Sequence, residues 1–218
     1  MMDSLLYSLS AGPVATNVYL ILHPESGTAV CIDAPAGCFA WVKQHLDDHA
    51  CKLTELLLTH THWDHTADAA PLVKATGAEV YVHAADLYRL TDPMNHTIWP
   101  LPFEIEPVAA DHFLNDGDVL QLKGATFEVL HTPGHTEGGV CFVDHVRHKV
   151  YAGDTLFAGS IGRTDLPGGD AELLLKSIAD RLFTLPGDYV VLPGHGPTTT
   201  IGEERVTNPF VGENANEN

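Results

Sequence analysis

The order of apolar and polar positions predicts strands followed by mixed strands and helices, in two successive halves. Short apolar runs bounded by Gly, Pro or polar clusters are typical of strands, whereas Phe39, Val42 and Leu46 recur at helical spacing. The first half is expected to hold strands at residues 5–9, 17–22, 28–32, 53–58 and 79–82, and helices at 37–49 and 67–76. The second half is expected to hold strands at 119–122, 126–130, 139–143, 149–152 and 189–192, and a helix at 170–183. The pattern predicts the α/β fold class, with two sheets packed face to face and helices outside.

Length and hydropathy favour one domain. The chain has 218 residues, of which 44% are hydrophobic, so it can bury a substantial single core. The Pro-rich passage 93–107 is expected to be an ordered loop, because flexible linkers are usually more polar. We therefore expect a single domain over residues 1–212. The tail 213–218 is apolar only at Ala215 and is expected to be disordered.

The charge balance narrows the class of partner. There are 11 basic and 29 acidic residues, for a net charge of −18, whereas nucleic acids and anionic membranes require clustered Lys or Arg. We expect neither as a partner. The start of the chain has no secretion signal, no apolar run reaches ~20 residues, and the four cysteines lack Cys-x-x-Cys spacing. These features predict a cytoplasmic protein with reduced thiols, and none of them bears on oligomeric state.

One stretch concentrates metal-binding side chains. Thr59-His60-Thr61-His62-Trp63-Asp64-His65 directly follows the apolar run 53–58. Strand alternation would place His60 and His62 on one face, and a turn into a helix would bring Asp64 and His65 to the same cavity. Burial of four such polar groups without partners would cost several kcal/mol. A site for zinc or a related transition metal is therefore the expected use.

Three further candidates follow the ends of other predicted strands. His135, Asp154 and His195 each come after an apolar strand and a glycine. A residue without Cβ lets the backbone turn tightly beside a crowded site, and strand ends hold ligands rigidly. These residues are therefore candidates for the same metal site.

Together these residues carry a family resemblance. Thr59-His60-x-His62-x-Asp64-His65, followed by His135, Asp154 and His195, resembles the metallo-β-lactamase superfamily over nearly the whole chain. Segments 152–163 and 192–197 are similar to the glyoxalase II group, the hydroxyacylglutathione hydrolases, and 202–210 resembles its short bacterial members. The resemblance implies a four-layer αβ/βα sandwich of two mixed β-sheets, with helices on the outer faces and metals at the sheet edge.

The resemblance also implies a ligand set and a cofactor. Its members bind two divalent metal ions, with Zn²⁺ the first choice here and iron or manganese as alternatives. The implied ligands are His60, His62 and His135 for the first metal, Asp64, His65 and His195 for the second, and Asp154 for both. Water between two zinc ions has its pKa lowered from 15.7 towards ~7, which gives a hydroxide nucleophile that Asp64 could hold in line. Asp33, Thr59 and Thr155 could orient the ligands, or could instead make turn and capping hydrogen bonds.

The implied substrate is a small-molecule thioester, with S-lactoylglutathione or another hydroxyacylglutathione first. Full-length members of the group contact glutathione through a C-terminal helical extension, whereas this sequence ends soon after His195. Arg163 falls where the family places a glutathione-binding lysine, and Arg205 is a second candidate for the substrate carboxylates. An ion pair between Arg163 and Asp165 is the alternative interpretation. We expect weak or broad thioesterase activity, because a net charge of −18 repels anionic substrates.

Other functions stay open. Persulfide dioxygenases share the fold and a run like Gly162-Arg163-Thr164-Asp165 but use one iron, and such a site does not require His195. A non-enzymatic metal-binding or scaffold protein would be expected to have lost a ligand, and none is lost here. Hydrolysis of another thioester, a lactone, a β-lactam or a nucleic acid completes the alternatives, although the acidic charge speaks against the last.

Overall fold

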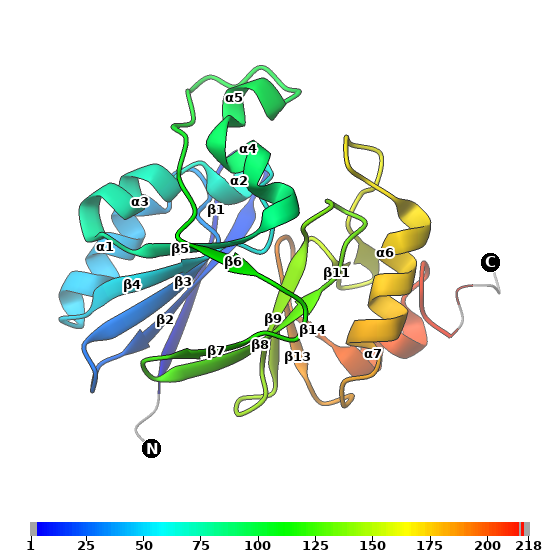
Figure 1. Cartoon of the computed structure of the whole chain (residues 1–218). Coiled ribbons are helices and arrows are strands. Elements are labelled where there is room, and N and C mark those ends of the chain that lie inside the picture. The colour runs from blue at the N-terminus through cyan, green and yellow to red at the C-terminus, as the bar shows by residue number, and fades with distance from the viewer. Residues whose placement is uncertain (1–3, 214, 216–218) are drawn as a thin grey trace. The chain divides into compact units, whose positions relative to one another are not determined.

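The computed structural model describes residues 4–213 and residue 215 (Figure 1). The chain forms two compact units, Met1–Leu114 with Leu122–Ala125 and Asn115–Gln121 with Thr126–Asn218, called here the first and second units. The single domain expected over 1–212 stays a prediction. Residues 214 and 216–218 of the predicted disordered tail lie outside the described residues, and at 213 the backbone N–H donates to the carbonyl of Arg205.

The first unit is built on a mixed six-stranded sheet. Its strands are, in spatial order, β1 (Leu5–Ala11), β2 (Thr16–His23), β3 (Thr28–Ile32), β4 (Lys52–Leu57), β5 (Glu79–His83) and β6 (His112–Leu114). β1, β2 and β3 pair antiparallel, whereas β3 to β6 pair parallel. The carboxyl ends of β3, β4 and β5 therefore meet at one edge of the sheet, where functional groups collect in α/β proteins.

Helices cover one face of this sheet (Figure 1). The helical elements of the first unit are α1 (Phe39–Asp48), α2 (Trp63–Thr66), α3 (Ala69–Thr76), the 3₁₀ turn η1 (Ala84–Asp86), α4 (Leu87–Thr91) and α5 (Pro93–His96). Val42 and Leu46 of α1 and Leu72 of α3 pack in the core. The helix predicted at 67–76 begins two residues later, at Ala69, and the N–H of Asp68 before it donates to the Ala34 carbonyl at 2.9 Å.

The second unit contains nearly all of another mixed six-stranded sheet, of which only Leu122 and Ala125 belong to the first unit. Its spatial order is β14 (Thr199–Thr200), β13 (Val190–Pro193), β10 (Lys149–Gly153), β9 (Val140–Asp144), β8 (Ala125–His131) and β7 (Val119–Leu122). β10 pairs parallel with β13 and antiparallel with β9, which pairs antiparallel with β8. β8, β10 and β13 thus run in the same direction, so their carboxyl ends share one edge.

The remaining elements of the second unit lie beside this sheet. They are the hairpin β11 (Leu156–Phe157) and β12 (Ser160–Ile161), α6 (Ala171–Ser177), the π-helical turn η2 (Ile178–Leu182) and α7 (Ile201–Thr207). Leu174, Ile178 and Ile201 pack on one face of the sheet (Figure 1). The helix predicted at 170–183 therefore exists, with its last turn widened.

The strand and helix predictions agree with the structure except for short elements. Those missed are α2, η1, α4, α5, β6, β11, β12, β14 and α7. α7 had a usable signal, the capping box Thr200-x-x-Glu203, in which the Thr200 hydroxyl accepts from the Glu203 N–H at 3.1 Å. The four cysteines are free thiols, as expected, and burial raises the pKa of Cys141 to about 11.

None of the helices in the described part of the chain combines the length and the apolar character needed to span a membrane.

Candidate metal centre

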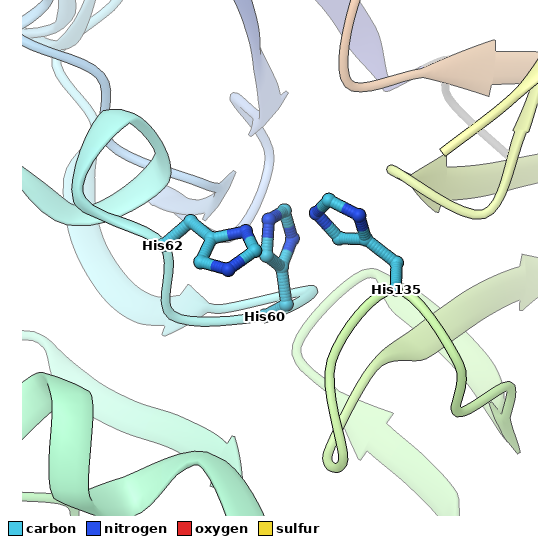
Figure 2. Close-up of side chains that lie close together, drawn as sticks. All are labelled: His60, His62 and His135. Carbon is cyan, nitrogen blue, oxygen red and sulfur yellow. The ribbon is translucent and has the colours of Figure 1, made fainter. Parts of the chain in front are cut away.

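Four candidate ligand side chains of the first unit gather at the carboxyl end of β4. His60 and His62 lie on the loop after this strand, with ring centroids 5.0 Å apart and planes at 90° (Figure 2). The ring centroids of His65 and His60 lie 4.0 Å apart, and Asp64 Oδ2 lies 3.5 Å from His65 Nε2. His60 and His65 are buried. The structure thus brings together the four groups that the sequence predicts at this edge.

Residues 59–65 are called here the ligand loop. Asp33, which follows the neighbouring strand β3, holds this loop in place by hydrogen bonds. Its Oδ1 accepts from the Thr59 N–H at 2.9 Å, and its Oδ2 accepts from the Thr59 hydroxyl at 2.8 Å and lies 2.7 Å from His65 Nδ1. A carboxylate only accepts, so Nδ1 of His65 carries the hydrogen and Nε2 keeps its lone pair for a metal. The Thr59 oxygen lies 3.2 Å from His60 Nδ1 and can orient that ring in the same way.

Two further positioning groups of the first unit were not identified from the sequence. The hydroxyl of Thr16, on β2, donates to Asp64 Oδ2 at 2.7 Å. Asp86, which follows β5, accepts from the Thr61 N–H at Oδ2 (3.1 Å) and from the Thr61 hydroxyl at its carbonyl (2.8 Å). Arg89 Nη1 donates to Asp86 Oδ1 at 3.2 Å. Residues that follow β3 and β5 therefore both hydrogen-bond to the ligand loop, which itself follows β4. No local sequence pattern indicates that Thr16 or Asp86 is a positioning group.

The second unit gathers three candidate ligand side chains at its own strand ends. His135 is on the loop after β8 (Figure 2), Asp154 directly follows β10, and His195 follows β13. Asp154 Oδ2 lies 3.4 Å from His135 Nε2 and 3.4 Å from His195 Nε2. The carbonyl of Arg163 lies 2.7 Å from His135 Nδ1. Because a carbonyl only accepts, this contact also leaves the lone pair of His135 on Nε2.

The ligand spacings in both units fit a metal ion. Two ligands that each lie about 2.1 Å from one tetrahedral metal stand about 3.4 Å apart. The pairs Asp64–His65, Asp154–His135 and Asp154–His195 have 3.5, 3.4 and 3.4 Å between the facing atoms. Imidazole nitrogens and carboxylate oxygens suit zinc, iron and manganese alike. The residues present therefore fit a transition metal, and these groups could hold one.

The two arginines proposed from the sequence are placed differently from the ligands. Arg163 is half exposed, and its Nε and Nη2 donate to Asp165 Oδ1 and Oδ2 at 2.7 and 2.8 Å. The hydrogen bond from Arg163 lowers the pKa of Asp165 to about 2. Arg205 Nη2 donates to the Leu185 carbonyl, before β13 begins, whereas His195 follows its other end. A role of Arg205 in substrate binding stays a prediction.

Thr155, the third residue expected to orient ligands, contacts a different neighbour. Its hydroxyl lies 3.0 Å from the hydroxyl of Thr132, and its N–H donates to the carbonyl of Ala152. These are the turn and packing contacts of the alternative interpretation.

Residues 11–195 match the family model described as the metallo-β-lactamase superfamily. The chain belongs to this superfamily. An uncharacterized protein of Mycobacterium tuberculosis is 38% identical over an alignment of 219 positions. The alignment covers 95% of this chain and 97% of that protein. The hydroxyacylglutathione hydrolase GloC of Haemophilus influenzae is 38% identical over 198 residues, covering 89% of this chain and 92% of GloC.

Several solved structures have the same fold as this chain. The B3 metallo-β-lactamase BLEG-1 has a TM-score of 0.86 and 36% identity, covering 95% of this chain and 99% of its own. TTHA1623, solved in a di-iron-bound form, has a TM-score of 0.82 and 38% identity, with 94% and 99% covered. ETHE1 from Myxococcus xanthus has a TM-score of 0.79 and 28% identity, with 95% and 84% covered. The predicted fold class, two mixed sheets with helices in a metallo-β-lactamase fold, is confirmed.

Proposed function

We propose that this superfamily member is a metal-dependent hydrolase of thioesters, with hydroxyacylglutathiones such as S-lactoylglutathione as the first substrates. The observation that carries the proposal is the pair of ligand groups, four side chains in the first unit and three in the second. Seven ligands exceed what one tetrahedral ion takes, so two divalent cations are expected. The 38% identity with GloC over most of both chains supports the thioester class.

The proposed ligand assignment divides the seven side chains between two cations. His60, His62 and His135 would hold the first, Asp64, His65 and His195 the second, and Asp154 both. In support, the same oxygen, Asp154 Oδ2, is 3.4 Å from one histidine of each set. Metal identity is left to experiment, because the donor set suits zinc and iron and a related structure holds two irons.

The chain's own residues would prepare the reaction by fixing donor atoms and protons. When bound, the cations would supply Lewis acidity for the thioester carbonyl and would lower the pKa of bound water towards neutral pH. Asp33 and the Arg163 carbonyl keep His65 and His135 protonated at Nδ1, so both rings present Nε2 and need not reorganise. The Thr16 hydroxyl holds the Asp64 carboxylate, which would accept a hydrogen bond from the attacking water.

The chemistry of the leaving group favours a thioester over an amide. A thiol with a pKa of about 8.5 departs as thiolate with little protonation, so no dedicated acid is required. Substrate recognition would be modest. Arg163 is engaged by Asp165, and a substrate carboxylate has to compete with that bidentate pair.

Metal analysis of protein purified without added metal, combined with two assays, tests the proposal. The assays are hydrolysis of S-lactoylglutathione and oxygen uptake with glutathione persulfide. Two metals per chain with thioester hydrolysis are expected. A single iron with oxygen uptake would replace the proposal with persulfide dioxygenase activity.

A variant pair sharpens this test. His195→Ala is expected to release one metal and reduce hydrolysis by orders of magnitude. His112→Ala, an exposed histidine on β6 that contacts Glu79, serves as the matched control and should behave as wild type. Near-normal turnover of His195→Ala would mean that one metal suffices.

A further inference from the structure

The segment formed by β11, β12 and the two residues after them touches all three ligands of the second unit. The Phe157 ring meets the His195 ring edge-on, with centroids 6.0 Å apart. A Cβ on Gly162 would lie 1.8 Å from the Asp154 carbonyl oxygen and 3.2 Å from His135 Cγ, so the backbone at Gly162 packs directly on the Asp154 backbone and the His135 ring. The Arg163 carbonyl orients His135. The position of this hairpin therefore sets the orientation of the three ligands.

The hairpin is too short to hold its own position. Its strands pair only at Leu156–Ile161 and Phe157–Ser160. An isolated two-stranded hairpin is marginally stable at best, and this one has two residues in each strand. Leu156 is buried in the core and Ile161 packs against that core, whereas the turn between the two strands is exposed and needs an anchor from outside the hairpin.

Two buried polar residues of the C-terminal segment supply that anchor. Glu204, on α7, accepts at Oε2 from the Gly159 N–H at the hairpin turn, at 3.0 Å. Asn208 Nδ2, just after α7, donates to the Ser160 carbonyl at 3.0 Å and to Glu204 Oε2 at 2.7 Å. Glu204 and Asn208 are 2% and 0% exposed. The C-terminal segment thus hydrogen-bonds to the hairpin at its turn and at its second strand.

The other oxygen of Glu204 fixes the carboxylate in turn. Oε1 accepts from the Thr199 hydroxyl on β14 at 2.7 Å, so donors from three different segments converge on one buried carboxylate. Burial of a carboxylate is unfavourable unless hydrogen bonds compensate, and an apolar residue would stabilise a core equally well. A carboxylate here therefore points to placement of the hairpin.

We propose that Glu204 is a positioning residue for the metal ligands His135, Asp154 and His195, acting through β11 and β12. The proposal rests on the proposed function, because it requires these three side chains to bind metal. Glu204 and Asn208 act at a distance from the ligands, so their effect is on metal affinity and geometry. Loss of ligand-positioning partners typically weakens metal binding by roughly 10–100-fold.

Chelator competition with Zn²⁺ on the full chain tests the role of Glu204. Glu204→Leu keeps the approximate size and removes both acceptors, so Zn²⁺ binding should weaken roughly 10–100-fold. Glu204→Gln keeps one oxygen for Gly159 and Asn208, and the Thr199 hydroxyl can turn to accept from the new amide. It should therefore retain affinity within a few-fold of wild type. Glu172→Leu is the matched control, at an exposed position of α6 in the same unit.

Denaturant unfolding of the metal-free proteins separates positioning from general stability. The proposal expects Glu204→Leu to remain folded under assay conditions and to bind Zn²⁺ weakly. Affinity within twofold of wild type, or an equal loss in Glu172→Leu, would overturn it. If Glu204→Leu does not fold, Asn208→Ala decides, because it removes the donor to Ser160: weakened binding supports the proposal and unchanged binding refutes it.

The outcome also separates this proposal from the proposed function. Two Zn²⁺ ions in wild type, lost in part by His195→Ala but unaffected by Glu204→Leu, would refute only the role of Glu204. Wild-type protein that binds no metal would overturn both.

Discussion

Replacement of Asp33 by asparagine perturbs the ligand loop of the first unit with little change of shape. Asp33 accepts three hydrogen bonds, from the Thr59 N–H, the Thr59 hydroxyl and His65 Nδ1. Its φ is +60°, a conformation that asparagine tolerates as well as aspartate, so the backbone should be retained. The substitution therefore isolates the effect of exchanging one acceptor oxygen for an NH₂ donor.

The Thr59 N–H decides how the new amide orients. A backbone donor cannot reverse, so Asn Oδ1 is expected to face it, which leaves the NH₂ group beside His65 Nδ1. The imidazole then accepts at Nδ1 and carries its hydrogen on Nε2, the wrong tautomer for a metal ligand. The Thr59 hydroxyl also loses its acceptor. We expect metal affinity to fall roughly 10–100-fold, about 1.4–2.7 kcal/mol, and metal-free stability to fall by about 1–3 kcal/mol.

Two measurements check this prediction. Competition with a chelator gives the Zn²⁺ affinity, and urea unfolding of the metal-free protein gives the stability. Asp47→Asn on α1, whose carboxylate is exposed and pairs only at the surface with Lys43, is the control and should leave both values unchanged. Metal affinity within twofold of wild type for Asp33→Asn would show that Asp33 does not set the tautomer of His65.

Four further predictions concern other contacts, the pH profile and metal removal. Gly162→Ala should displace the Asp154 carbonyl and weaken Zn²⁺ binding more than tenfold, since its Cβ would lie 1.8 Å from that oxygen; unchanged binding would mean that the hairpin can move freely. Asp165→Asn should release Arg163 and lower KM for S-lactoylglutathione several-fold at constant kcat, and an unchanged KM would exclude Arg163 as a substrate contact. The pKa of Asp165 is lowered to about 2, so the Arg163–Asp165 pair persists above about pH 4 and opens only as the pH falls towards 2. We therefore expect this pair to make no contribution to the pH profile of the activity near neutrality. Chelation should lower Tm by about 5–10 °C, because ligand at 100 times its Kd contributes about 2.7 kcal/mol and a domain of this size shifts about 2–4 °C per kcal/mol; a Tm that ignores both chelator and added Zn²⁺ would contradict metal binding.

The candidate metal ligands could be identified from the sequence, because each lies next to a strong local signal. His60, His62, Asp64 and His65 follow a buried apolar strand within one loop, and their proximity in space follows from their proximity in sequence. Strands long enough to show an apolar run were predicted nearly to the residue. β6, β12 and β14 were not, because strands of two or three residues exist only through pairing with distant partners and carry no periodicity of their own.

The groups that hold the ligands in place were decided by the tertiary structure alone. Thr16, Asp86, Glu204 and Asn208 contact residues between 25 and 48 positions away, and locally they look like any Thr, Asp, Glu or Asn. For Arg163 the sequence allowed either a substrate contact or an ion pair, and the fold places Asp165 within hydrogen-bonding distance of its guanidinium.

The sequence by itself determined which side chains can bind metal and which strands deliver them, because ligand chemistry and apolar runs are local properties. The tertiary structure decided how those side chains are oriented, which imidazole nitrogen faces the metal, and what the C-terminal helix contributes. Hydrogen bonds between distant segments form only when the sheets and hairpin have folded, so no residue pattern along the chain could specify them.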